Sequence, residues 1–168
     1  GTINVESGTL SMNSLTKTFD GGIYNISNGS GLSLNILTHI NGTLTGVLNG
    51  VFNWNSNISV SGAATLNFTG TNAVNWNNSS LLGGGNLTNE SPIILATAGS
   101  RYISGNTTLT NKSLVTMPAN GYLYIIDTSV FNNTSSGTFD IQSDAILSYS
   151  GGGAHQFNNA GLLKRTTT

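Results

Sequence analysis

The sequence contains no cysteine and few charged residues. Of its 168 residues only 7% are charged, whereas about a quarter is usual in globular proteins. Without cysteine the chain has neither a disulfide framework nor thiol chemistry. The formal net charge of −1 gives no electrostatic attraction toward nucleic acid or an anionic membrane surface. We therefore expect no nucleic-acid partner.

Long apolar runs and helix signals are also missing. No stretch approaches the roughly 18 apolar residues of a membrane span, and we see no signal peptide. No segment keeps apolar residues at positions i, i+3, i+4 and i+7 for three turns, because Gly and Asn interrupt every window. We expect no membrane insertion in this segment and no helix.

Alternation between one apolar and one polar residue is what recurs. Each alternating stretch predicts a short strand with one apolar face and one face of Asn, Ser or Thr. An all-β fold follows from this pattern. The stretches are 3–5, 10–12, 32–34, 52–54, 66–68 and 74–76.

These strands come in a recurring phrase of strand, corner and strand. A second phrase, FNN, begins at Phe131 and again at Phe157. Neighbouring copies are often about 20 to 30 residues apart, which is the range of solenoid repeats. The spacing varies, so we expect loops of unequal length, such as residues 82–92. The copies of the first phrase are INVESGTLSM at 3–12, YNISNGSGLSL at 24–34, ISVSGAATLNF at 58–68 and FDIQSDAILSY at 139–149, with a shorter VLNGVFNW at 47–54.

Two architectures give such a pattern. In an antiparallel β-sandwich each phrase would be a hairpin, whereas in a parallel β-helix it would be a corner of one coil, with the next copy stacked above. Like side chains recur at matching positions, and Asn recurs where stacked strands form amide ladders. Scarce charge also avoids the stacking of like charges. We predict a parallel β-helix (β-solenoid) of about seven coils, with the antiparallel β-sandwich as the alternative.

The phrases resemble the repeat units of very large bacterial surface proteins, the filamentous-haemagglutinin-like and autotransporter-like adhesins. Those families carry tandem phrases of the type F-N-N-x-G-T-hydrophobic-x-V-x-S-G-T-L-x-hydrophobic. The resemblance implies a right-handed parallel β-helix outside the cell, used as a stalk or an adhesive. It rests on GTINVESGTLSM at the start, SGAATLNF at 61–68, and FNNTSSGTFDIQS and FNNAGLLKR near the end.

The first heptad, GTINVES at 1–7, matches GTFDIQS at 137–143 in residue type at every position. If a parent protein repeats a unit of about this length, a slightly longer fragment shows its first phrase twice. We therefore expect residues 1–168 to be a single β-solenoid segment excised from a larger repetitive protein, with neighbouring repeats of the same chain as partners. Residues 97–128 fit the phrase poorly, and we expect a loop or an inserted strand pair there.

Acidic residues give no catalytic motif. Asp140 and Asp144 are the only closely spaced acids. Paired carboxyl groups that hydrolyse glycosides lie about 5 to 9.5 Å apart, whereas residues four apart in one strand are more distant. We interpret Asp140 as facing water and Asp144 as part of a turn.

The histidines and glycine runs give no cofactor or metal site. His39 and His155 have no companion at a metal-ligand spacing. The Gly-Gly-Gly runs at 83–85 and 151–153 lack the Lys-Ser/Thr of a phosphate-binding loop, and we interpret them as flexible loops. The sequence predicts no enzyme, no cofactor and no metal.

Trp54 and Trp76 are the candidate ligand-stacking residues. Each ends an alternating strand among Asn residues, so an exposed pair could stack on sugar rings. The alternative, which we favour, is that both indoles fill the core. Thr-x-Thr motifs occur at 16–18, 43–45 and 108–110, but ice binding needs a flat, regular array, and these motifs are far apart in the sequence.

These observations favour a non-enzymatic structural or adhesive segment, a stalk or adhesion repeat, of a large extracellular bacterial surface protein. Its expected location is the bacterial cell surface. The alternative is a glycan- or ice-binding β-helical module, in which a glycan or surface ligand joins the neighbouring repeats as a partner.

Overall fold

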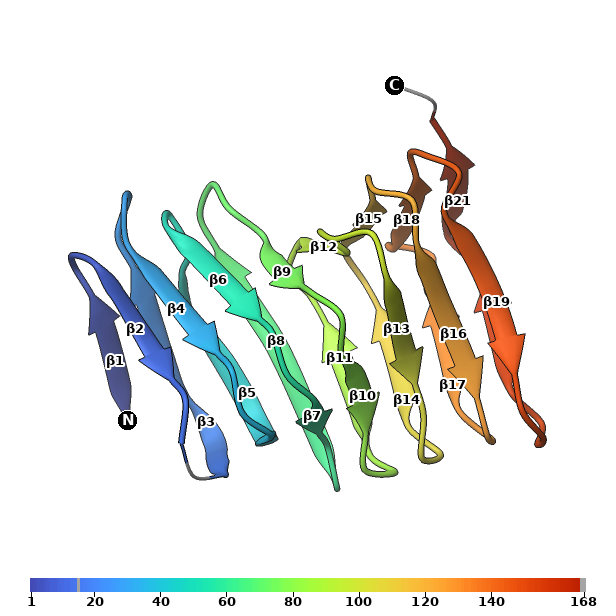
Figure 1. Cartoon of the computed structure of the whole chain (residues 1–168), viewed down its shortest axis with the longest axis horizontal. Helices are drawn as coiled ribbons and strands as arrows, with labels where there is room; N and C mark the ends of the chain where they lie inside the picture. The colour runs from blue at the N-terminus through green and yellow to red at the C-terminus, as the bar shows by residue number, and fades with distance from the viewer. Residues whose placement is uncertain (15, 167–168) are drawn as a thin grey trace.

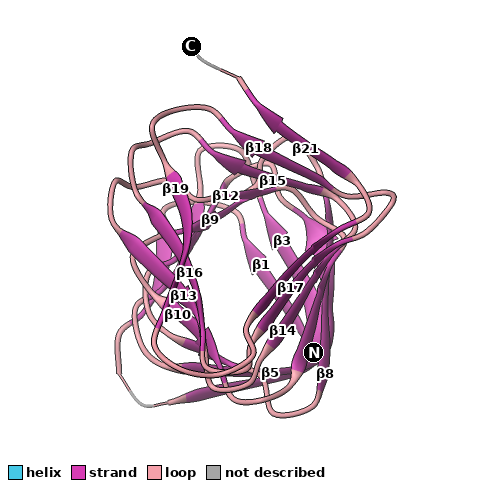
Figure 2. Cartoon of the chain, turned by 90° about the vertical axis from the view of Figure 1, so that its right-hand side faces the viewer, coloured by secondary structure: helices cyan, strands magenta, loops and turns pink. Residues whose placement is uncertain are grey.

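The computed structural model describes residues 1–14 and 16–166, which form strands joined by turns and loops, without a helix. The strands are parallel and stack along one axis, and each coil crosses three sheet faces (Figure 1). In Figure 2, which looks from the C-terminal side, the chain runs anticlockwise as it advances toward the viewer. The winding is therefore right-handed. The prediction of a right-handed parallel β-helix is confirmed, and the antiparallel β-sandwich is wrong.

We number the three faces in chain order. Face 1 consists of β1 (Thr2–Val5), residues 22–26 of β3 (Lys17–Ile26), residues 42–47 of β5 (Thr38–Val47), β8 (Ala63–Thr69), β11 (Asn86–Asn89), β14 (Thr108–Asn111), β17 (Val130–Asn133) and β20 (Gln156–Asn159). Face 2 consists of β2 (Thr9–Met12), β4 (Gly31–Leu34), β6 (Val51–Trp54), β9 (Val74–Trp76), β12 (Ile93–Ile94), β15 (Leu114–Met117), β18 (Thr138–Ile141) and β21 (Leu162–Arg165). Face 3 consists of residues 17–20 of β3, residues 38–41 of β5, β7 (Ile58–Ser59), β10 (Ser80–Leu82), β13 (Ser100–Ile103), β16 (Tyr122–Ile126) and β19 (Ile146–Ser150).

Two long strands bend from face 3 to face 1. β3 and β5 turn at Gly21 and Gly42, whose φ angles are +76° and +64°. Such left-handed conformations suit glycine because it lacks a Cβ atom. The two bent strands join faces 1 and 3 into one 13-stranded sheet, whereas face 2 is a separate 8-stranded sheet.

Stacked coils repeat about every 22 residues. The separation of paired residues ranges from 19, for Val74 with Ile93, to 26, for Val130 with Gln156. The described residues form seven complete coils and the first two strands of an eighth. The unequal separations arise in the corners, so the strands themselves stay in register.

The core lies inside the coils and follows from the period-two alternation. In β8, for example, Ala64, Leu66 and Phe68 are buried, whereas the residues between them point outward. Burial of a Leu, Ile or Phe side chain stabilises the fold by about 1.5–3 kcal/mol. The interior is therefore a continuous apolar column whose repeating layers hold the three faces together.

The recurring phrases occupy different corners of the coil. The copies at 3–12 and 24–34 both turn from face 1 to face 2 and stack directly, and FNN at Phe131 stacks on FNN at Phe157 as expected. The copy at 58–68 turns from face 3 to face 1, and the copy at 139–149 turns from face 2 to face 3. Every corner needs a bend between two alternating strands, so similar phrases do not mark equivalent positions.

The matching heptads at 1–7 and 137–143 also lie on different faces. GTINVES enters β1 on face 1, whereas GTFDIQS enters β18 on face 2. The residues of the first coil equivalent to Gly137–Ile141 are those of GTLSM at 8–12. The match between the heptads reflects a shared strand-and-corner chemistry and does not measure the length of a longer repeat.

Two expected irregular regions are regular in the structure. Residues 97–128 contain β13 to β16, which pair residue by residue with the coils on either side. Residues 82–92 contain β11, which pairs with β8 and β14. The expectation of loops or an inserted strand pair was wrong, because backbone hydrogen bonds stack a coil whether or not its side chains repeat a phrase.

Candidate functional site

Trp54 and Trp76 lie in the core. Their side chains are 3% and 1% exposed, and their rings stack with centroids 4.8 Å apart and planes at 9°. The Nε1 of Trp76 donates a hydrogen bond to Ser79 Oγ at 3.0 Å. The core interpretation is confirmed, and neither indole offers a face to a sugar ring.

Asp140 and Asp144 do not form a carboxylate pair. Asp140 Oδ2 lies 3.2 Å from Lys164 Nζ, and its side chain is only 5% exposed. Asp144 Oδ1 lies 2.7 Å from Arg165 NH2, with its side chain 87% exposed. The expectation that Asp140 faces water was wrong, because β21 stacks on β18 and covers it. Each carboxylate forms an ion pair with a different basic residue of the next coil, Asp140 with Lys164 and Asp144 with Arg165.

The surroundings of Asp140 keep it ionised. Burial raises the pKa of this carboxyl group, but hydrogen bonds from Gln142, Thr166 and Lys164, together with the charge of Lys164, outweigh burial. The pKa is consequently lowered from its ordinary value. A general acid needs the opposite shift.

The two histidines lie in different coils. His39 lies on β5, and His155 stacks on the exposed Tyr149 with ring centroids 4.7 Å apart. Residues 1–14 and 16–166 hold no group of three or more His, Asp or Glu residues placed to bind a metal. Over the same ranges no helix has the length and apolar character needed to cross a membrane.

The two glycine runs differ. Gly83 has a φ of +109°, and a Cβ on Gly85 would lie 2.3 Å from the carbonyl oxygen of Gly62. The run at 83–85 is therefore a tight corner against the preceding coil, and its interpretation as a flexible loop was wrong. Gly151 and Gly152 are exposed, with open space where a Cβ would lie.

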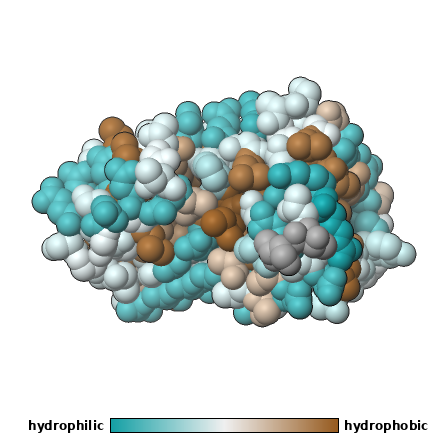
Figure 3. Space-filling model, turned by 90° about the horizontal axis from the view of Figure 1, so that it is seen from above, coloured by the Kyte–Doolittle hydropathy of each residue, from teal (hydrophilic) through white to brown (hydrophobic). Residues whose placement is uncertain are grey.

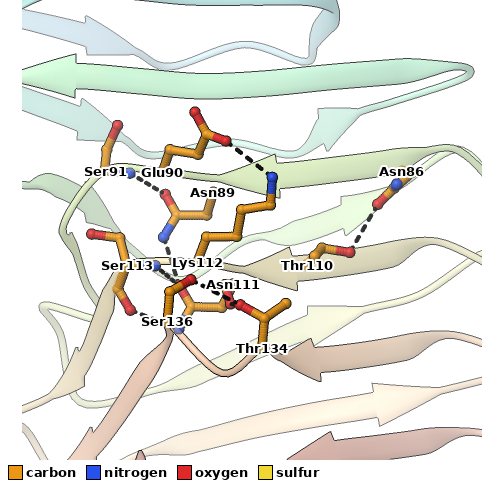
Figure 4. A network of polar contacts seen from close by, with 10 residues as sticks. All are labelled: Asn86, Asn89, Glu90, Ser91, Thr110, Asn111, Lys112, Ser113, Thr134 and Ser136. Atoms are coloured by element: carbon orange, nitrogen blue, oxygen red, sulfur yellow. Dashed lines mark hydrogen bonds and ion pairs between the residues drawn. The ribbon is translucent and has the colours of Figure 1, made fainter. Parts of the chain in front are cut away.

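An asparagine ladder with three buried members and one exposed member lines the corner between faces 1 and 2, and Figure 4 shows Asn89 and Asn111 from it. Each amide Nδ2 donates to Oδ1 of the next coil, at 2.9, 2.8 and 2.7 Å. Asn111 also accepts from the backbone N–H of Ser113 at 3.2 Å and donates to its carbonyl at 2.9 Å. The ladder side chains thus form hydrogen bonds to backbone groups of the turn as well as to one another. Its members are Asn89, Asn111, Asn133 and Asn159.

A second asparagine ladder lies in solvent at the corner between faces 2 and 3. Its side-chain amides are joined by hydrogen bonds of 2.6, 2.7 and 2.6 Å. The two ladders confirm the amide stacking that the recurring Asn residues predicted. The members of this second ladder are Asn13, Asn35, Asn55 and Asn77.

Arg101 replaces a backbone donor where the second ladder ends. In the earlier coils the carbonyl at this corner accepts a hydrogen bond from a backbone N–H of the following coil. The N–H of Asn77, for example, donates to the carbonyl of Trp54. The carbonyl of Trp76 instead accepts from Arg101 Nε at 2.8 Å. The guanidinium also donates to Thr97 and Gly99, and burial lowers the pKa of Arg101. This buried cation, 1% exposed, serves the corner and faces no cleft.

The outer surfaces carry two side-chain arrays that the sequence did not reveal. On face 3 the rings of Tyr102, Tyr122 and Tyr124 stack with centroids 5.2 and 5.3 Å apart. On face 1 four threonines occupy one column in successive coils. Both arrays depend on pairings between residues 22 or 23 positions apart, which only the register of the coils specifies. The threonines are Thr43, Thr65, Thr88 and Thr110.

The surface seen in Figure 3 contains no single large apolar area. Hydrophobic residues lie in separate small areas among hydrophilic ones. The enclosed cavity in the core is tiny, about 20 Å³, and is lined by apolar side chains that include Leu34, Phe52 and Trp54. Open hollows lie at the two ends of the stack, one lined by residues that include Val5 and Leu10 and the other by residues that include Tyr149, His155 and Phe157.

No protein-family model, curated protein or solved structure matches the chain.

Proposed function

We propose that the chain is a non-enzymatic structural and adhesive segment of a large extracellular bacterial surface protein. The observation that supports this function is the unbroken stack of parallel coils, in which successive strands on all three faces pair in register. Such a stack is a quasi-one-dimensional rod, because each coil contacts only its neighbours. Its work is to hold a distal part of the protein away from the cell and to present its outer faces.

Rigidity in this rod comes from repeated hydrogen bonds. Backbone bonds on three faces join each pair of coils, and the two asparagine ladders add side-chain bonds at the corners. The chain has no cysteine, so this stiffness requires no disulfide. The extracellular bacterial setting rests on the resemblance of its phrases to the repeats of large surface adhesins.

Single-molecule stretching tests the mechanical part of the proposal. When the protein is pulled between its termini, we expect successive peaks with contour-length increments of about 8 nm, because about 22 residues at about 3.6 Å each leave the stack together. A featureless extension at low force would contradict a load-bearing role. An antibody raised against this segment should label intact producing cells, and labelling only after lysis would contradict the surface location.

A further inference from the structure

Face 1 differs from the other faces in carrying no charge. Its strand segments, from β1 through β20, contain no Asp, Glu, Lys, Arg or His. Face 2 carries Asp140, Lys164 and Arg165, and face 3 carries Lys17 and Asp20. Glu90 and Lys112, which directly follow β11 and β14, pair at 3.1 Å at the edge of face 1 (Figure 4). The strands of face 1 therefore carry no charge, and their exposed side chains include Thr and Asn together with the apolar Ile23 and Val47.

The centre of face 1 is a column of threonines. Thr43 pairs with Thr65, Thr65 with Thr88, and Thr88 with Thr110. Stacked parallel strands lie about 4.8 Å apart, so the four hydroxyl and methyl groups repeat at this spacing. Asn132 and Asn158 continue the column over the next two coils. Thr43 of the motif at 43–45 and Thr110 of the motif at 108–110 thus share one column, whereas Thr45 and Thr108 lie on opposite sides of it.

This column projects from a regular sheet. The residues on either side of Thr65, Thr88 and Thr110 are buried, so these threonines point outward, and Thr43 is itself exposed. From β5 to β20 the pairing on face 1 has no register shift. Figure 2 shows these strands forming one wall of the solenoid. The threonine column is consequently regular along the axis of the stack, whereas the positions two residues away along each strand, about 6.6 Å apart, carry different residue types.

The threonine hydroxyls are available to water. Over the described residues, those of Thr43, Thr65 and Thr88 make no hydrogen bond to another residue, whereas Thr110 Oγ1 lies 3.3 Å from Asn86 Oδ1. A hydroxyl can both donate and accept, and the adjacent methyl group restricts where a bound water can lie. A row of such groups orders water with a period that the backbone sets.

We propose that face 1 binds ice. Ice presents uncharged oxygens in a flat lattice whose repeats are of the same order as the strand spacing, and each hydroxyl can join that lattice. A protein partner would need Trp, Tyr or Arg hot spots, and a small ligand would need a concave site. The outward column on face 1 consists instead of Thr and Asn on the outer face of a parallel sheet with constant register. This activity goes beyond the role of a structural rod.

An ice-recrystallisation assay with the full chain tests the proposal. We expect the wild-type protein to inhibit crystal growth, and Thr65→Lys to require at least tenfold more protein for the same effect. The introduced ammonium group would hold its own hydration shell in the middle of the array. Thr88→Tyr, which adds bulk without charge, should weaken inhibition similarly.

The matched control is Thr9→Lys, which places the same charge on β2 of face 2. It should inhibit within twofold of the wild type, and far-ultraviolet circular dichroism should show that all variants are folded. A wild-type protein without inhibition would overturn the proposal, as would folded Thr65→Lys and Thr88→Tyr variants that inhibit normally. Binding to a glycan array without ice inhibition would also overturn it, while the stretching experiment would still decide the structural role.

Discussion

The two halves of the solenoid carry different asparagine ladders. In coils one to four the ladder runs through solvent at the corner between faces 2 and 3. In coils five to eight it runs at the corner between faces 1 and 2, where Asn89 and Asn111 are 0% exposed and Asn133 is 1% exposed. The side-chain amide distances are nearly the same in both ladders, 2.6 to 2.7 Å against 2.7 to 2.9 Å.

The difference shows that a ladder Asn can have two separate roles: bonding the Asn of the next coil, and bonding backbone N–H and C=O groups of a turn. An exposed Asn such as Asn55 competes with water for its partner, so its net contribution is small. Asn111 is buried and also bonds backbone groups of Ser113 and Thr138, which are half-buried residues. The contribution of a ladder Asn to the free energy of unfolding therefore depends on which other groups its side-chain amide bonds.

Replacing Asn111, a buried Asn in the middle of its ladder, should have the largest effect on the free energy of unfolding. Asn111→Leu removes the partners of two other ladder amides and of turn backbone groups. A buried polar group left unsatisfied costs about 1–3 kcal/mol, so we expect a loss of about 3 kcal/mol or more in the free energy of unfolding. Urea unfolding followed by circular dichroism measures this. A loss below about 1 kcal/mol would contradict the role given to this ladder.

Arg101→Met tests the junction where the exposed ladder ends. The methionine fills much of the space but leaves the carbonyls of Trp76 and Thr97 without their donor. The carbonyl of Gly99 loses the guanidinium and keeps the N–H of Tyr122. We expect the free energy of unfolding to fall by about 2 kcal/mol, less than the sum of three lost bonds, because removing a buried charge returns some stability. Increased stability of this variant would show that the guanidinium is not needed at the corner.

Asp140 gives the second half a dependence on acid. Its pKa is lowered in the folded state, so the unfolded chain, with an ordinary pKa of about 3.9, takes up the proton first as pH falls. The stabilisation is therefore full above about pH 4 to 5 and disappears as pH falls through the lower folded value. Urea midpoints at pH 6 and pH 3 should differ more for the wild type than for Asp140→Asn. Asp144→Asn, at an exposed ion pair, should keep the wild-type difference.

The smallest effect is expected at the exposed ladder. Asn55→Ala breaks the bonds to Asn35 and Asn77, but water replaces them. We expect the free energy of unfolding to change by about 0.5 kcal/mol or less. A change comparable to that of Asn111→Leu would remove the distinction between the two ladders.

The sequence predicted the strands better than their places in the coil. Alternation at 10–12, 32–34 and 52–54 predicted β2, β4 and β6 because one side of each strand faces an apolar core. The phrase at 58–68 was wrongly taken as equivalent to the one at 3–12, because every corner joins two alternating strands. Register depends on contacts between coils, which a local pattern does not specify.

The candidate sites show the same limit. Alternation placed Trp54 and Trp76 on the same side as Phe52 and Val74, and this was enough to favour the core. The tyrosines of face 3 were missed, and the threonine motifs at 43–45 and 108–110 were noted but set aside as too far apart, because each array gathers residues from different coils. Only a correct register brings Thr43 and Thr110 into one column.

Disulfide formation between introduced cysteines tests the stacking of coils most directly. The chain has no cysteine of its own, so the paired variants Thr65→Cys and Thr88→Cys can bond only to each other within one molecule. A disulfide requires Cα atoms within about 7 Å, which register partners on neighbouring strands satisfy. We expect rapid cross-linking in this variant and none between Thr65→Cys and Thr110→Cys, which lie two coils apart. A folded Thr65→Cys, Thr88→Cys protein that stays reduced under oxidising conditions would contradict the in-register solenoid.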